Sequence, residues 1–337
     1  QHGKIVENKS KTALFKKPKH PYTKALLACR PNIHKNVKKL ATVNDFIENE
    51  QFDLNEFYNQ NERSLEQIKK NRDHFYDQAS IMEVKNLSKV YSDKSFFSSG
   101  SEVTALNKVS LELFKGESLG IVGESGCGKS TLCKCIVQLE KQNEGSILYK
   151  GTNIDKLIAK DPMSYRKAVQ MIFQDPASAL NPKMCIGHIF MEVMQVHQIG
   201  ENTSERKSRS IELLKKVGLD SEHFNRYPHE FSGGQKQRIG IARALAVEPK
   251  ILICDESVSA LDVSVQAQVL NLLNELKESF SLSYIFISHD LSVVKHFCDR
   301  IVVLNNGIIE EIGFPEELFE GAKSNYTRKL IEAIPGI

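Results

Sequence analysis

Gly123-Glu-Ser-Gly-Cys-Gly-Lys-Ser-Thr131 decides the fold of this 337-residue chain. It follows the apolar run 118–122 and fits the pattern G-x-x-x-x-G-K-[ST], whose glycines let the backbone point its amide hydrogens at phosphates. The helix expected to begin near Lys129 adds the positive end of its dipole, and Ser130 is suited to ligate magnesium. A chance glycine-rich turn would rarely satisfy so many positions. The predicted phosphate-binding residues are Gly123, Glu124, Ser125, Gly126, Cys127, Gly128, Lys129, Ser130 and Thr131.

Two adjacent carboxylates end a second apolar run. Lys250-Ile-Leu-Ile-Cys-Asp-Glu256 is typical of a buried parallel strand that delivers charge to the carboxyl edge of a sheet. Phosphoryl transfer needs an in-line nucleophile, so we expect Asp255 to hold magnesium, directly or through water, and Glu256 to polarise the attacking water. Acidic residues at a strand end are often only solvated turn residues. The phosphate loop upstream favours the catalytic interpretation.

Phe231-Ser-Gly-Gly-Gln235 resembles the signature motif of the ATP-binding-cassette (ABC) ATPases. The resemblance continues in family order with a glutamine loop at 171–176, a D-loop at 259–262 and a switch histidine at His289, and covers about 81–337. It implies an active ATPase that uses ATP and Mg²⁺ and forms half of a clamp, because the signature caps nucleotide held by an opposing domain. The implied fold is α/β: a P-loop NTPase (RecA-like) core, an antiparallel β subdomain and a helical signature subdomain.

The resemblance also implies roles for single residues, although a lone histidine is more often structural. His289 would contact the γ-phosphate, and Gln174 would sense magnesium and the attacking water. The implied catalytic residues are Lys129, Gln174, Glu256 and His289. The implied magnesium ligands are Ser130, Gln174 and Asp255. The implied contacts to nucleotide across a dimer are Ser232, Gly233, Gly234 and Gln235, and Asp262 of the D-loop is a further implied nucleotide-binding residue.

An aromatic residue before the phosphate loop would complete the nucleotide site. Tyr91 follows the strand-like run 81–87, where the family places a ring that stacks on adenine. Phe96 or Phe97 could take that place, because an insert near 92–101 blurs the spacing. A core or surface aromatic is the alternative for each of the three.

The two ends of the chain repeat each other without gaps. Gly3-Lys-Ile-Val-Glu7 aligns with Gly307-Ile-Ile-Glu-Glu311, and 22–27 aligns with 326–331, at one offset of 304 residues (307 minus 3, 326 minus 22). A repeat at domain-sized spacing predicts two homologous domains in tandem, of which 1–31 is the C-terminal tail of the first. Chance similarity of short helical segments is the alternative, and the constant offset argues against it.

His20-Pro-Tyr-Thr-Lys-Ala-Leu-Leu27 resembles a segment near the end of ATPase subunits of oligopeptide, dipeptide and nickel importers, and the runs 179–184 and 261–268 match the same group. This implies the second half of a fused tandem ATPase that powers an importer, with oligopeptides or dipeptides as cargo. A soluble tandem cassette acting on ribosomes and a non-catalytic module that uses ATP only to dimerise are the alternatives. The implied partners are a second nucleotide-binding domain (fused upstream domain, homodimer or paralogous subunit), membrane permease subunits and, indirectly, an extracytoplasmic substrate-binding protein.

A segment without glycine separates the predicted tail from the cassette. Residues 32–80 are rich in Asn, Lys, Glu and Gln and are expected to form a linker. Within it, 64–76 predicts a short amphipathic helix, and a docked helix and a flexible tether are both compatible with it. The residues near one face of that helix are Leu65, Ile68, Arg72 and Phe75. The cassette itself is expected over 81–337, with an importer-type extension from about 314.

Composition limits the choice of partners. The formal net charge of +3 is small for this length and favours neither nucleic acid nor an anionic membrane as a partner. The seven cysteines contain no Cys-x-x-Cys pair, so reduced thiols are expected. No apolar run approaches the ~20 residues that span a bilayer. We therefore expect a cytoplasmic protein that meets the inner face of the membrane through a partner.

Overall fold

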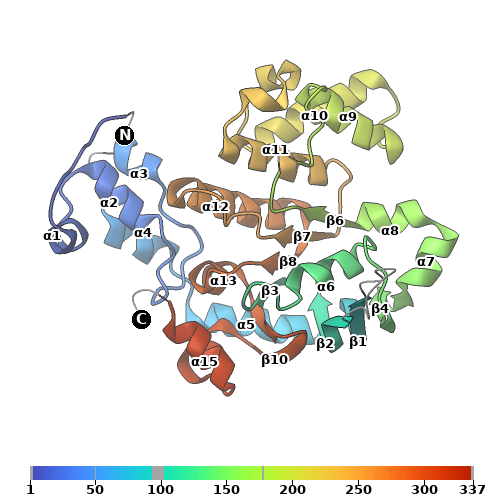
Figure 1. Ribbon diagram of the computed structural model, residues 1–337. Coiled ribbons are helices and arrows are strands. Elements are labelled where there is room, and N and C mark those ends of the chain that lie inside the picture. The colour runs from blue at the N-terminus through green and yellow to red at the C-terminus, as the bar shows by residue number, and fades with distance from the viewer. Residues whose placement is uncertain (1–2, 50, 93–101, 177, 335–337) are drawn as a thin grey trace, which may run out of the picture.

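Six strands form the central sheet of the computed structural model, which describes residues 3–49, 51–92, 102–176 and 178–334. The order is β10-β9-β3-β8-β7-β6, and all neighbours are parallel except the β9–β10 hairpin (Figure 1). The predicted α/β core is therefore confirmed. The strands are β3 (Ser118–Val122), β6 (Val169–Ile172), β7 (Ile251–Asp255), β8 (Ser283–Ile287), β9 (Arg300–Asn305) and β10 (Ile308–Gly313).

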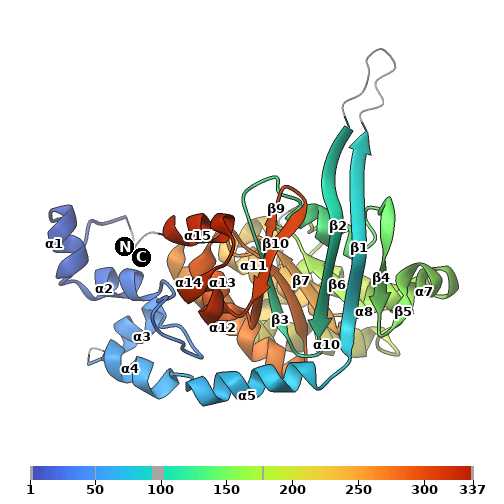
Figure 2. The same cartoon turned by 90° about the horizontal axis from the view of Figure 1, so that it is seen from below.

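An antiparallel sheet of order β2-β1-β4-β5 packs beside this core, as the sequence predicted. β1 and β2 are long and project away from the rest of the molecule (Figure 2). α6 (Lys129–Ile136) lies between the sheets, where Leu132 and Ile136 are completely buried in a core that includes residues of both sheets. The remaining strands are β1 (Ser80–Ser92), β2 (Glu102–Phe114), β4 (Glu144–Tyr149) and β5 (Thr152–Asn153).

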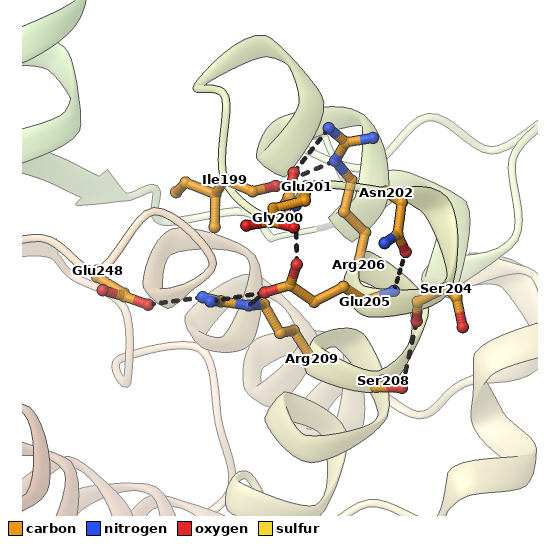
Figure 3. Close-up of polar contacts among 10 residues, drawn as sticks. All are labelled: Ile199, Gly200, Glu201, Asn202, Ser204, Glu205, Arg206, Ser208, Arg209 and Glu248. Atoms are coloured by element: carbon orange, nitrogen blue, oxygen red, sulfur yellow. Dashed lines mark hydrogen bonds and ion pairs between the residues drawn. The ribbon is translucent and has the colours of Figure 1, made fainter.

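Helices dominate the segment between β6 and β7, which confirms the predicted helical subdomain. Arg209 of α10 joins two parts of it: its guanidinium donates to Glu205 at 3.0 Å and to Glu248, just before β7, at 3.1 Å (Figure 3). Arg206 donates to the carbonyl oxygens of Ile199 and Gly200. The helices here are α9 (Ile186–Val196), α10 (Thr203–Lys216), η1 (Ser221–Asn225), η2 (Pro228–Glu230) and α11 (Gly233–Leu245).

Four more helices surround the sheets. Asp262 caps α12, the longest helix among the described residues, and Asp290 caps α13. No helix in the described ranges is both long and apolar enough to cross a bilayer. The four are α7 (Ile154–Lys160), α8 (Pro162–Ala168), α12 (Val263–Phe280) and α13 (Leu291–Phe297).

The predicted linker packs against the body of the protein. The Asn271 side chain on α12 accepts from the Leu40 N–H and donates to the Leu40 carbonyl oxygen, both at 2.8 Å and both buried. Phe46 and Tyr58 join the same core. The predicted amphipathic helix is present as α5, with Phe75 buried and Ile68 half-buried, while the side chains of Leu65 and Arg72 lie outside the described residues. The linker helices are α3 (Val43–Glu48), α4 (Leu54–Asn61) and α5 (Leu65–Tyr76).

The sequence repeat is also a structural repeat. Glu7 accepts hydrogen bonds from the N–H groups of Lys19 and His20, and Glu311 accepts them from the residues 304 positions later, Lys323 and Ser324. The helices that follow start at the same offset. The first copy has α1 (Lys11–Lys16) and α2 (Pro21–Ala28), and the second has α14 (Pro315–Gly321) and α15 (Asn325–Glu332).

Candidate functional site: the carboxyl edge of the parallel sheet

The predicted phosphate loop joins β3 to α6 and depends on its glycines. Gly123 and Gly128 have φ of +151° and +109°. A Cβ atom at Gly123 would collide with the Leu304 carbonyl oxygen, and one at Gly128 would collide with the Ala105 carbonyl oxygen. Only glycine fits these positions, so the fold itself requires a curled loop whose amides can face an anion.

Lys129 lies inside this loop. Its side chain is buried, and its ammonium donates to the carbonyl oxygens of Gly123 at 2.7 Å and Glu124 at 2.8 Å. Cys127 is buried with its Sγ 3.7 Å from the ammonium. The loop thus holds a cation at its centre, as phosphate binding requires.

Two candidate oxygen ligands for magnesium meet at the start of α6. The Ser130 hydroxyl donates to Asp255 Oδ1 at 3.1 Å. Burial raises the pKa of the Asp255 carboxyl above its ordinary value, and the bond from Ser130 offsets part of that rise. Hard oxygens suit Mg²⁺, which usually takes one or two carboxylates and completes its shell with water and substrate phosphates. In the described ranges no group of three His, Cys, Asp or Glu side chains could hold a metal alone.

Three further candidate residues meet at one carboxylate. Gln174 Nε2 donates to Glu256 Oε2 at 3.1 Å, and His289 Nδ1 lies 3.7 Å from the same oxygen. The residues follow β6, β7 and β8, which are neighbours in the sheet, so the parallel topology brings them to one edge. Glu256 has φ +47°, a strained conformation for a glutamate and one found preferentially at functional sites.

The signature residues form the start of α11. Ser232 Oγ accepts from the Gln235 N–H at 3.4 Å, and Gln235 Oε1 accepts from the Ser232 N–H at 3.0 Å. A Cβ at Gly234 would collide with Val265, whereas Gly233 faces open space. No hydrogen bond within the described ranges links these residues to the phosphate loop. The structure does not bring the two nucleotide motifs together within one chain.

A groove of about 630 Å³ runs beside the signature. The docked linker supplies part of its wall with Lys39, Thr42 and Asn44. Other lining residues come from α11, its cap and α12, including Ser232, Gln235, Arg238 and Gln268. This contribution from the linker could not be predicted, because no local pattern in 39–44 indicates where the segment docks.

Two candidates have a visible structural role. Asp262 caps α12 by accepting from the N–H groups of Ser264 and Val265, both at 3.1 Å. Burial would raise the pKa of its carboxyl, but the bond from the Ser264 hydroxyl together with the N–H bonds outweighs burial and lowers it. Tyr91 lies within β1 and not after it, because its strand continues to pair with β2 through Val103. The Lys89 ammonium sits 4.9 Å from the Tyr91 ring centroid. Phe96 and Phe97 lie outside the described residues.

Two loop contacts were missed by the sequence reasoning. The Tyr326 hydroxyl accepts from the Glu124 N–H at 3.1 Å, and the Gly307 N–H donates to the Cys127 carbonyl oxygen at 2.9 Å. The repeat singled out both positions, but it gave no indication that they contact the loop.

Comparisons with known families agree with this geometry. Residues 106–259 match the family described as "ABC transporter". Residues 6–51 match the family described as "Oligopeptide/dipeptide transporter, C-terminal region". The second match falls on the first copy of the repeat and on the docked linker.

Relatives with curated names give a similar result. The chain is 50% identical to the oligopeptide transport ATP-binding protein OppF of Haemophilus influenzae over 76% of this chain and 78% of that protein. It is 46% identical to OppF of Bacillus subtilis over 76% and 82%. It is 40% identical to the glutathione import ATP-binding protein GsiA of Salmonella paratyphi A over 99% of this chain and 52% of that protein.

Solved structures resemble the cassette region. A dimeric post-hydrolysis state of the ATP-binding cassette MJ0796, bound to ADP and Pi, superposes with a TM-score of 0.62 at 29% identity, covering 69% of this chain and 98% of that one. CbiO1 from Clostridium perfringens, part of an ABC transporter complex, superposes with a TM-score of 0.62 at 28% identity over 77% and 97%.

Proposed function

Because the chain belongs to the ATP-binding-cassette family, among the ATP-binding subunits of oligopeptide transporters, we propose that it works in a pair of cassettes that closes on ATP and opens on hydrolysis. The chain is an ATPase that uses ATP and Mg²⁺. One observation supports the assignment most: Ser130–Asp255 and Gln174–Glu256–His289 meet at the sheet edge beside the phosphate loop.

Each residue of this edge has a proposed part in phosphoryl transfer. Lys129 and the loop amides would hold the β- and γ-phosphates, and Glu256 would take a proton from the attacking water. Gln174 would hold that water and His289 would face the γ-phosphate. Ser130 and Asp255 would hold Mg²⁺, whose charge would offset that of the phosphate oxygens.

The signature supports the proposal of a paired cassette. Ser232 and the open face at Gly233 lie at the positive end of α11, where an anion is favoured. Since no bond in the described part of the chain joins them to the phosphate loop, we place them on nucleotide held by a second cassette. MJ0796 was solved as a dimer bound to ADP and Pi. That second cassette would be an upstream domain, another copy of this chain or a paralogous subunit.

The first copy of the repeat favours an upstream domain. We propose that 1–31 ends a preceding cassette, that 32–80 links the two, and that 81–337 is the second cassette with its extension. A family named for a C-terminal region matches 6–51, and the alignment with GsiA takes in this whole region. The proposal predicts a native protein that carries another phosphate loop about 304 residues before Lys129; an intact native mass of 38.0 kDa would contradict it.

Peptide import is the proposed task. The named relatives serve oligopeptide and glutathione transport, and permease partners follow from their being ATP-binding subunits. We place the chain on the cytoplasmic face of the membrane, held there by permease subunits and supplied indirectly by an extracytoplasmic binding protein. None of the relatives given above is named for a role on ribosomes, so that alternative has no support.

Replacing Glu256 by Gln tests the mechanism. A general base contributes roughly 10²- to 10⁴-fold, so ATP hydrolysis should fall by about that factor while ATP binding persists. Light scattering in magnesium and ATP should then show the 38.0 kDa mass doubling as an ATP-trapped dimer. Glu278→Gln, at an exposed carboxylate on α12, is the matched control and should hydrolyse ATP like the parent.

Two results would change the proposal. A parent chain that binds ATP but stays monomeric without turnover would mean that a different cassette supplies the opposing signature. A Glu256→Gln chain that hydrolyses ATP at the parent rate would remove Glu256 from the catalytic role.

A further inference from the structure

The phosphate loop is held from outside by the C-terminal part of the chain. The Gly307 N–H, between β9 and β10, donates to the Cys127 carbonyl oxygen at 2.9 Å. The Tyr326 hydroxyl, on the first turn of α15, accepts from the Glu124 N–H at 3.1 Å. The two contacts bracket Ser125 and Gly126, the exposed tip of the loop. The shape of the loop is therefore supported by residues about 180 to 200 positions further along the chain.

The helix that carries Tyr326 is itself fixed. Glu311 accepts from the N–H groups of Lys323 at 2.9 Å and Ser324 at 3.1 Å, which sets the turn before α15. Ile331 is buried, and together with Val122, the last residue of β3 before the loop, it lines one small cavity. These contacts fix α15, and Tyr326 with it, next to the end of the strand that leads into the loop.

Glu124 is the residue on which these contacts converge. Tyr326 accepts from its N–H, and Lys129 donates to its carbonyl oxygen at 2.8 Å. If Lys129 turned its ammonium toward phosphates, as the proposed function implies, the Glu124 carbonyl oxygen would keep the Cys127 N–H as a donor at 3.3 Å, within the loop itself. The bond to Tyr326 would still tie Glu124 to a part of the chain outside the loop, and a loop already held in its binding shape loses less conformational entropy on binding.

We infer that Tyr326 is a positioning residue for the phosphate loop, through which the C-terminal extension sets nucleotide affinity. The inference rests on the proposed role of 123–131 as the phosphate-binding loop. No hydrogen bond in the described ranges joins Tyr326 to Gln174, Glu256 or His289. Loss of the hydroxyl should therefore weaken binding and leave the chemical step alone.

Tyr326→Phe and Tyr22→Phe make a matched pair. The two tyrosines occupy equivalent places in the repeat, but within the described residues the Tyr22 hydroxyl makes no hydrogen bond. Calorimetric titration with Mg-ADP should show Tyr326→Phe binding about threefold to tenfold more weakly, the effect of one neutral hydrogen bond, and Tyr22→Phe binding like the parent. The KM for ATP should rise by the same factor with kcat unchanged.

Glu311→Gln and Glu7→Gln make a second pair. Each replaces a carboxylate that accepts from the two N–H groups before a helix. Only the Glu311 variant loosens the helix that carries Tyr326, so it alone should weaken Mg-ADP binding, by less than Tyr326→Phe does. A second Mg-ADP titration of Tyr326→Phe combined with Glu311→Gln should show less than additive loss, since both act through one contact.

The outcomes separate this inference from the proposed function. Equal Mg-ADP affinity in the parent, Tyr326→Phe and Tyr22→Phe would overturn the positioning role and leave the ATPase assignment intact. A fall in kcat at unchanged KM would overturn it as well. A parent chain that binds no Mg-ADP would instead remove the proposed phosphate loop, and this inference with it.

Discussion

Residues 7–28 and 311–332 have one local structure in two environments. Each has a glutamate that accepts from two N–H groups, a short helix, and a second helix with a side-chain cap, from His20 in the first copy and Ser324 in the second. The second copy begins within β10, which pairs with β9, whereas residues 4–9 form no strand. Because the same helices form in both copies, their local sequence is enough to form them. The neighbouring elements determine which of their side chains are buried.

Burial differs between the copies at matched positions. Ile331 is 8% exposed and its counterpart Leu27 is 37% exposed; Phe319 packs against the core while Phe15 is 62% exposed. Ile5 is 86% exposed, while its counterpart Ile309 lies in β10. In the second copy these side chains pack against its own cassette, whereas the matched side chains of the first copy are exposed. This difference supports the proposed upstream cassette (Figure 2).

The largest expected difference between the copies is in stability. Ile331→Ala should lower the free energy of unfolding by about 2–4 kcal/mol, because it removes buried methyl groups and leaves a cavity. Leu27→Ala, at the equivalent but exposed position, should cost about 1 kcal/mol or less. Urea unfolding followed by circular dichroism measures both. Equal costs would mean that the first copy is packed as tightly as the second, against the structure.

The clustering of the candidate residues was predictable from sequence because they sit in motifs with fixed spacing. The apolar runs before Gly123, Glu256 and His289 indicated buried parallel strands, and parallel strands share a carboxyl edge. What could not be predicted was the docking of the linker. Leu40 is tied to Asn271, 231 residues away, and no local pattern in the linker identifies that partner.

Some missed elements did have local signals. α3 and α4 were not predicted, although the Thr42–Asp45 capping box and the Asp53 cap mark their starts. The Tyr326 contact with the loop had none, because a hydroxyl bound to a backbone N–H from a distant segment leaves no trace in composition or spacing. Tyr91 was placed after its strand for a related reason: β1 continues only because β2 pairs with it.

A smaller effect on stability tests whether an upstream cassette covers the exposed side chains of the first copy. In this chain Phe15→Ala should change stability by no more than ~0.5 kcal/mol, as at other exposed sites. In a protein that carries the upstream cassette, the same change should cost about 1 kcal/mol or more, since partial burial of the ring would be lost. Phe319→Ala is the control and should cost the same in both proteins. If Phe15→Ala cost the same stability in both proteins, the upstream cassette would not cover this ring, and the tandem proposal would be weakened.

The smallest expected effect is pH-dependent and should be common to both copies. The ion pair with Lys9 and the N–H groups of Lys19 and His20 lower the Glu7 pKa from 4.5 to about 2, and N–H groups lower the Glu311 pKa despite some burial. A carboxyl with a depressed pKa stabilises the fold fully above its unfolded pKa, and that stability is lost as pH falls toward the folded value. The stability lost in Glu7→Gln should therefore be constant from pH 7 to 5 and shrink below pH 4.5. Glu311→Gln should show the same sign in urea midpoints measured across that range. A difference that grows as the pH falls would mean that Glu7 is protonated in the folded protein and does not accept these bonds as a carboxylate.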